Sequence, residues 1–246
     1  MLHLMILGVR SIFILTFFLF SCQNSLQLNT IIGSAQGTFY SVKYFSKNKI
    51  VTKLQIDSLL SEIDLSLSSY KSESLISRVN RNKEKKLDNY LNQVLVRSLE
   101  LCNQTNGFFD VTIAPVVNLH GFGYDIVDND DQINYDSIIG CDKIIIKDDT
   151  IFKKNNKIKI DINGIAQGYS VDIISNFLRS KKINDFIVNI GGEIFCSGNK
   201  KGEDWVVAIE KPFMNIQKPI YILNLSNKAL ATSDSYRKIK KIDKKI

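Results

Sequence analysis

The sequence predicts an α+β fold, a mixed β-sheet with flanking helices. Strand-type and helix-type hydrophobic periods occur along the chain without the regular strand–helix–strand repeat of a parallel α/β protein. The clearest change of period lies in 157–178, where isoleucines in alternate positions give way to apolar residues at helical spacing. No internal repeat and no proline-rich linker divides the 246 residues. We therefore expect one principal core, with helices packed to one side of the sheet.

The N-terminal segment predicts export. Residues 1–22 contain Arg10, then an apolar run over 11–20 that is too short to span a bilayer, then Ser21 and Cys22. The ending Leu-Phe-Ser-Cys resembles a bacterial lipobox, so Cys22 is expected to be the lipidated first residue of the mature chain. A secreted protein and a signal anchor are the alternatives. The polar residues 23–33 read as a tether, followed by one domain over 34–246.

Charge and cysteine content limit the function classes. The formal net charge is +7, but 237–245 carries six basic residues and one Asp, so the rest of the chain is near neutral. This distribution does not favour a nucleic-acid partner. Cys102, Cys141 and Cys196 are widely spaced and have no metal-binding pattern. Either one pair forms a disulfide or all three are buried thiols.

The first part of the domain predicts a strand over 34–44 and an amphipathic helix over 52–67. Residues 68–80 are polar and rich in serine, and they predict a solvated loop that ends in a short helical turn. A second helix is expected over 88–104, capped by Asp88 and ended near Gly107.

Residues 107–123 combine aromatic residues, an Asp, a Pro and several glycines with no sustained period. Such a segment is more typical of a site wall than of a core element. Phe108 and Phe109 could stack on an aromatic ligand, and Asp110 could accept a hydrogen bond from it. The alternative is a core aromatic pair beside a turn.

The remaining segments predict mostly strands. Residues 124–156 read as variable surface with two short strands at 144–146 and 151–152. Further strands are expected at 185–190, 193–196, 205–210 and 220–225, and 230–237 reads as a strand end. Gly191 and Gly192 predict a hairpin turn or a close approach of the backbone to a ligand.

The segment 157–178 is the candidate centre of the molecule. We expect a strand through Ile158, Ile160 and Ile162, then a helix capped by Asn163. Gly164 allows a ligand to approach the free N–H groups of the helix, which suit an anion such as phosphate. Asp161 and the turn carbonyls offer the oxygen ligands that Mg²⁺ uses. An ordinary strand-to-helix connection would have the same sequence.

Several common catalytic sites are excluded. Beyond the signal segment the only histidine is His120, which rules out a histidine-rich zinc site and leaves little for a Ser-His-Asp triad. Glycine-rich dinucleotide and Walker patterns are absent. The remaining Asp, Gly, Thr and aromatic residues suit an aromatic ligand that carries phosphate, bound with a divalent cation. No residue is assigned as a catalytic base or nucleophile.

Six segments taken in order resemble the FAD:protein FMN transferases, the ApbE family of exported bacterial flavin transferases. They are QGTFYSV, SSYKSESLISRVN, GFFDVTIAPVVNLHGFG, DINGIAQGYSVD, NIGGEI and ATSDSYR. The resemblance implies Mg²⁺-dependent cleavage of FAD, transfer of FMN to a Thr or Ser hydroxyl of a target protein, and release of AMP. It also implies a lipid-anchored protein of the bacterial envelope on the periplasmic side. The implied acceptor is an exported or membrane-bound electron-transfer flavoprotein subunit.

The same resemblance implies the site residues. Gly164 is expected to offer its main-chain oxygen to Mg²⁺. The residues expected to contact FAD are Gln36, Tyr70, Phe108, Phe109, Asp110, Asp161 and Gln167.

The chain departs from the family pattern at three points. Gln167 stands where the family usually has Lys, and His120 stands where it often has Trp, which favours a packing role for this histidine. The family continues beyond Arg237 with further Mg²⁺ ligands, so the domain is expected to be incomplete at its C-terminus. These departures keep two alternatives open, an FAD pyrophosphate hydrolase and a non-catalytic flavin-binding lipoprotein.

Overall fold

The computed structural model describes residues 25–124, 134–210 and 219–233. The strands are β1 (Gln27–Ala35), β2 (Thr38–Ser46), β3 (Ile144–Lys147), β4 (Thr150–Lys153), β5 (Phe186–Ile190), β6 (Glu193–Ser197), β7 (Trp205–Glu210), β8 (Pro219–Leu225) and β9 (Lys228–Leu230). The helices are α2 (Lys53–Leu67), α3 (Leu75–Asn80), α4 (Asn89–Gln104), α5 (Ala114–Leu119) and α6 (Asn163–Ser180), with 3₁₀ turns η2 (Val111–Ile113), η3 (Tyr135–Ser137) and η4 (Cys141–Lys143).

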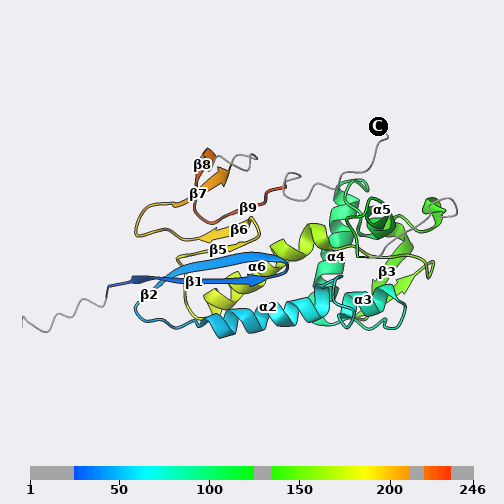
Figure 1. Cartoon of the computed structure of the whole chain (residues 1–246), viewed down its shortest axis with the longest axis horizontal. Coiled ribbons are helices and arrows are strands. Elements are labelled where there is room, and N and C mark those ends of the chain that lie inside the picture. The colour runs from blue at the N-terminus through cyan, green and yellow to red at the C-terminus, as the bar shows by residue number, and fades with distance from the viewer. Residues whose placement is uncertain (1–24, 125–133, 211–218, 234–246) are drawn as a thin grey trace, which may run out of the picture.

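The α+β class is confirmed, and the main sheet has the strand order β1-β2-β5-β6-β9. Every ladder between the described strands is antiparallel. Helices α2 and α6 run along one face of this sheet, and the β7–β8 hairpin lies on the other side (Figure 1). The core between sheet and helices consists chiefly of Tyr40, Val42, Tyr44, Ile56, Leu60, Val171, Ile174, Leu178, Phe186 and Val188.

The first strand begins earlier than expected. Residues 23–33 were expected to form a tether, but Gln27–Ala35 pairs with β2 along its whole length. Ile31 is buried, and Gly33 lies opposite Tyr40, whose ring occupies the space that a Cβ on Gly33 would need. The sequence did not predict this strand because most of its side chains face solvent and many of them are polar. The expected strand over 34–44 is therefore two strands joined at Gln36.

Two tight turns lie at the same end of the main sheet. Gln36 and Gly37 join β1 to β2, and Gly191 and Gly192 join β5 to β6. All four residues have positive φ, as two-residue hairpin turns require. Because β2 pairs with β5, the two turns are neighbours, and Gly191 N–H donates to the carbonyl of Phe39 at 3.0 Å. The hairpin predicted from the paired glycines is confirmed.

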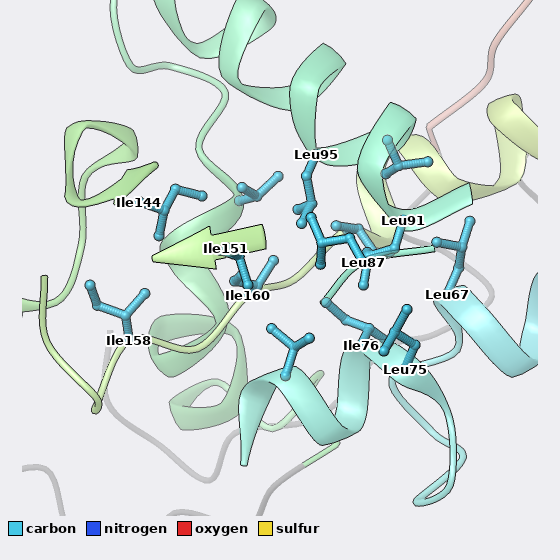
Figure 2. Close-up of a cluster of buried hydrophobic side chains, with 14 of the residues drawn as sticks. Leu67, Leu75, Ile76, Leu87, Leu91, Leu95, Ile144, Ile151, Ile158 and Ile160 are labelled. Carbon is cyan, nitrogen blue, oxygen red and sulfur yellow. The ribbon is translucent and has the colours of Figure 1, made fainter. Parts of the chain in front are cut away.

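A second core lies beyond the end of the sheet, among α3, α4, β3 and β4 (Figure 1). Figure 2 shows the side chains of these elements converging on Ile151 and Ile160. The helix caps that hold this region agree with the sequence prediction for α4, since Asp88 accepts from Leu91 N–H at 2.8 Å. Helix α2 likewise begins after Thr52, which forms a capping box with Gln55.

Residues 158–162 belong to no sheet, which corrects the expected strand. Ile158, Ile160 and Ile162 are each fully buried. The alternation of isoleucines therefore reflects the burial of these side chains and not pairing with another strand. The side chain of Asn80 takes the place of a partner strand. Its Oδ1 accepts from Ile160 N–H at 2.8 Å, and its Nδ2 donates to Ile160 C=O at 2.8 Å. One amide thus satisfies both backbone groups of a buried residue.

The later strands match the sequence prediction to within about two residues. Cys102 and Cys141 form a disulfide, and Cys196 is a buried thiol. None of the helices described is both long enough and apolar enough to cross a membrane. The predictions for 1–22 and for 234–237 concern residues outside those described.

Candidate functional site

A cavity of about 650 Å³ lies at the start of α6, beside the β1–β2 turn and the loop after α2. This volume is within the range of small-molecule and cofactor sites. Its lining residues come from parts of the chain that are far apart in sequence. They are Gln36, Gly37, Asp64, Leu67, Ser68, Tyr70, Lys71, Val117, Phe122, Asp161, Asn163, Ala166 and Gln167.

Gln36 is fixed in place at the edge of this cavity. Its Nε2 donates to Ser170 Oγ on α6 at 2.7 Å, and that hydroxyl donates in turn to Ala166 C=O at 2.8 Å. The Oε1 atom of Gln36 is buried and accepts no hydrogen bond within the described residues. A buried acceptor without a donor is costly, so this atom is a candidate contact for a ligand N–H or O–H.

No side chain caps the start of α6, which corrects the expectation for Asn163. The N-cap position is Ile162, and Asp161 Oδ1 accepts from Asn163 N–H at 2.7 Å. Asn163 is instead the first residue of the helix. The second carboxylate oxygen of Asp161 makes no hydrogen bond within the described chain. The carboxylate is therefore available to the cavity, next to the N–H groups at the positive end of the helix.

The aromatic residues of the cavity are Tyr70 and Phe122, both of which are exposed at its surface. Tyr70 lies in the turn between α2 and α3. The carbonyl of Ser68 in this turn accepts from the hydroxyl of Ser74 at 2.6 Å, and Ser74 also caps α3. An exposed ring on a well-anchored turn is suited to stacking on a planar ligand.

One cation and two carboxylates give the cavity its charge. Lys71 Nζ lies 3.2 Å from Asp64 Oδ2, and Asp161 is the other charged residue of the lining. The formal charge of these three residues is −1. A pyrophosphate entering the cavity would be repelled unless a cation accompanied it.

A second cavity of about 500 Å³ lies beside the first turns of α6. Asn163 and Gln167 line both cavities, whereas Gly164 lines only this one. Gln167 also touches the β5–β6 turn, since its Nε2 would lie 3.1 Å from a Cβ placed on Gly191. Glu193 lines this cavity, and burial raises the pKa of its carboxyl. The start of α6 is therefore the place where the two cavities meet.

The structure brings Gln36, Tyr70, Asp161 and Gln167 around one cavity, but it places Phe108, Phe109 and Asp110 outside both. Phe108 is 97% exposed. Phe109 packs against the second core, with its Cε2 atom 3.4 Å from the position of a Cβ on Gly164. Asp110 caps η2 by accepting from Thr112 N–H at 2.8 Å. The described geometry therefore gives this triplet a place behind the Asp161–Gly164 corner.

The oxygen donors at the start of α6 fit a hard cation. Mg²⁺ commonly takes one or two carboxylates and completes its shell with water and substrate phosphates. Asp161 offers the first cavity a carboxylate oxygen with no hydrogen bond among the described residues, and Gly164, three residues further on, lines the second cavity. The described residues contain one cluster of three acidic, Cys or His ligands, at Cys102, Asp110 and Cys141, but its two sulfurs are bonded to each other.

Sequence reasoning missed Asp64, Lys71 and Phe122. Lys71 directly follows Tyr70 in a segment that had already been singled out, and this adjacency was the available signal. Asp64 lies on α2, where an Asp between apolar positions reads as an ordinary solvated residue. Phe122 lies inside the predicted site wall, and the sequence does not distinguish it from Phe108 and Phe109 as a residue of the cavity. His120 is exposed at the end of α5 and lines neither cavity.

Fold and cavity together define an α+β protein with a candidate ligand site built from the β1–β2 turn, the loop after α2 and the start of a long helix. The sequence model of the ApbE family matches residues 36–246. A FAD:protein FMN transferase of Vibrio cholerae serotype O1 is 32% identical over 229 residues, which cover 88% of this chain and 69% of that protein. The chain belongs to the ApbE family.

Two solved structures agree in fold. The flavin transferase ApbE from Vibrio cholerae superimposes with a TM-score of 0.74 at 30% identity, over 87% of this chain and 74% of the other. The apo form of Pseudomonas stutzeri flavinyl transferase ApbE gives a TM-score of 0.73 at 26% identity, over 87% and 73%.

Proposed function

We propose that this protein transfers FMN from FAD to a Thr or Ser hydroxyl of a target protein and releases AMP. The single observation that carries the proposal is the cavity at the start of α6, which gathers Gln36, Tyr70, Asp161 and Gln167. The names of the similar proteins, FAD:protein FMN transferase, support this choice of substrate.

In this reaction the acceptor oxygen forms a bond to the phosphorus of the FMN half of FAD. The bridging P–O bond breaks, AMP leaves with the electron pair, and the acceptor hydroxyl loses its proton. We assign no described side chain to remove that proton. The roles that we propose for this chain are binding and orientation, which contribute much of the acceleration in phosphoryl transfer.

The two ends of the cavity suit the two ends of the ligand. The exposed ring of Tyr70 suits a flat flavin or adenine ring, while the first N–H groups of α6 suit the pyrophosphate. Lys71 is the positively charged residue of this lining, and it is paired with Asp64.

We propose Mg²⁺ as the cation that accompanies FAD, held by the Asp161 carboxylate and the Gly164 main-chain oxygen together with substrate phosphates. When bound, it would neutralise charge on the pyrophosphate. The support is the −1 formal charge of the cavity lining, which disfavours a bare pyrophosphate.

A direct test is to incubate the full chain with FAD, Mg²⁺ and a threonine peptide from an exported electron-transfer flavoprotein subunit. We expect flavin fluorescence on the denatured peptide and one AMP per flavin, and neither product with a Thr→Val peptide. Release of FMN and AMP without any labelled peptide would instead indicate a hydrolase. Tight FAD binding without turnover would indicate a non-catalytic binding protein.

We also propose a lipid anchor at Cys22 on the periplasmic side of the bacterial envelope, where an exported acceptor would be available. The support is the lipobox-like ending of the signal segment. Wild-type protein should sediment with membranes and incorporate labelled palmitate, whereas Cys22→Ala should do neither. Equal membrane association of the two proteins would contradict the anchor.

A further inference from the structure

The Cys102–Cys141 disulfide lies directly behind the proposed FAD site. Cys102 is buried near the end of α4, and Cys141 begins η4, 39 residues later. Between them in the chain lie Phe109, Asp110 and the turn η2. The carboxylate of Asp110 and the two sulfurs all lie within 4.8 Å of one another. The bond therefore fixes two segments around this carboxylate.

A short chain of hydrogen bonds leads from the disulfide to η2. Gly140, the neighbour of Cys141, donates its N–H to Thr112 Oγ1 at 2.7 Å. That hydroxyl donates to Asp110 Oδ1 at 2.7 Å, and the same oxygen accepts Thr112 N–H at 2.8 Å. Thr112 is fully buried, so its hydroxyl has no alternative partner in water.

The network continues to the cavity. Asp161 N–H donates to the carbonyl of Val111, the first residue of η2, at 2.7 Å. The carboxylate of Asp161 in turn accepts from the N–H of Asn163, the first residue of α6, at 2.7 Å. The ring of Phe109 also rests against the backbone of Gly164. Any displacement of η2 would therefore move the Asp161–Gly164 corner.

We propose that the Cys102–Cys141 disulfide is a positioning element for the FAD site, so that its reduction weakens FAD binding while the rest of the fold is retained. The inference rests on the proposed function, because FAD is its ligand. Coupling through a contiguous set of packed and hydrogen-bonded groups with two discrete arrangements is a physical route for such an effect.

The reduction itself requires a dithiol. One thiolate of the dithiol attacks a sulfur of the disulfide and releases one cysteine thiolate, which leaves a mixed disulfide. The second thiolate attacks the reagent sulfur of this mixed disulfide and releases the other cysteine thiolate. The dithiol becomes a cyclic disulfide, and Cys102 and Cys141 each gain one proton and one electron. Cys141 is the more exposed of the two residues, because it is half-buried whereas Cys102 is only 1% exposed.

The test measures FAD affinity by flavin fluorescence in Mg²⁺ buffer, before and after reduction of the full chain with a dithiol. We expect the Kd for FAD to rise by about fivefold or more, within the range of typical coupling between sites. Re-oxidation should restore it. The double variant Cys102→Ser/Cys141→Ser should have the Kd of the reduced protein, and the dithiol should not change this Kd. Cys196→Ala, which keeps the disulfide, should respond like the wild type.

A second measurement separates positioning from general stability. Hydrogen exchange of ligand-free protein should accelerate on reduction in 109–113 and 161–165 but not in α2. With the disulfide intact, Thr112→Val should raise the Kd as reduction does, because it removes the hydroxyl, and Thr112→Ser should restore the affinity. If the reduced protein unfolds, the Kd values of these two variants still test whether the hydrogen bonds of Thr112 position the FAD site.

The outcomes are distinguishable from failure of the proposed function. If oxidised wild type binds no FAD, the proposed function is overturned. The positioning role is then tested by hydrogen exchange alone, at 109–113 and 161–165. Equal Kd values for oxidised and reduced protein, with unchanged exchange at 161–165, would overturn the inference and leave the function intact.

Discussion

The amide nitrogen of Gln36 donates a 2.7 Å hydrogen bond to the hydroxyl of Ser170, although the two residues are 134 positions apart. This contact joins the β1–β2 turn to α6 and orients the remaining amide oxygen of Gln36, which is buried without a donor. The turn is therefore held in the conformation that a ligand would meet.

Gln36→Ala should weaken FAD binding by roughly three- to tenfold, the usual effect of losing one hydrogen bond. Alanine keeps the side chain β-carbon, so the positive-φ backbone of residue 36 is equally strained in both proteins. Isothermal titration calorimetry with FAD and Mg²⁺ measures the change. Ser170→Ala is the matched control, and it should have the smaller effect because it only orients the amide. An unchanged affinity in Gln36→Ala would remove this residue from the site.

Asp161→Asn should reduce the dependence of FAD binding on Mg²⁺. The asparagine oxygen can still accept from Asn163 N–H, so this hydrogen bond is retained while the negative charge is lost. Without metal the variant should bind FAD at least as tightly as wild type, since a repulsive charge is gone. With Mg²⁺ it should bind more weakly than wild type. Titrations in EDTA and in Mg²⁺ test both statements.

A matched control for this variant is Asp161→Ala, which also removes the acceptor for Asn163 N–H. It should lose about 0.5–1.5 kcal/mol of unfolding free energy, the usual net contribution of one hydrogen bond, whereas Asp161→Asn should lose much less. The same response to Mg²⁺ in wild type and Asp161→Asn would contradict a metal-binding role for this carboxylate.

Asn80→Ala should be strongly destabilising. The substitution leaves the N–H and C=O of Ile160 buried without partners, and each orphaned group costs about 1–3 kcal/mol. We expect a loss of about 2–4 kcal/mol, or a fall in Tm of roughly 4–16 °C for a chain of this size. Thermal unfolding followed by circular dichroism measures it.

The control for Asn80 is Asn176→Ala on α6. Asn176 accepts from Arg179 Nη1 at 3.0 Å in an exposed position, so its loss should cost at most about 1 kcal/mol. A loss for Asn80→Ala as small as for Asn176→Ala would show that Ile160 finds other partners.

The Cys196 thiol should resist alkylation in the native protein. Burial raises its pKa from the ordinary 9.0 to about 11, so only about 0.1% is thiolate at pH 8. In a Cys22→Ser protein without reductant, iodoacetamide should label one thiol after denaturation and almost none before. The native labelling rate should rise about tenfold per pH unit until pH approaches the pKa.

The thiol count also checks the disulfide. Reduction in denaturant should raise the number of labelled cysteines from one to three, because Cys102 and Cys141 are then freed. Rapid labelling of Cys196 in native protein at pH 8 would be inconsistent with its buried position.

The sequence by itself determined α2, α4, α6 and the later strands, but not α5, which lies in a segment without a sustained hydrophobic period. The predicted elements follow from local rules. The caps at Thr52 and Asp88 act within three residues, hydrophobic periods are read over single elements, and the paired glycines at 191–192 define their own turn. Four of the predicted contact residues also line one cavity. They were identified from motifs that occur in the same order as in the family, and members of a family share the arrangement of such motifs in space.

Only the tertiary structure decided which residues share a site. Ile158, Ile160 and Ile162 alternate like a strand, yet the partner of Ile160 is the side chain of Asn80. Lys71 meets Asp64 across a turn, while Phe108 points to solvent although its composition suggested a ligand wall. The physical reason is that a hydrogen bond or an ion pair across the fold depends on how distant segments pack, and no local pattern in the sequence encodes that packing.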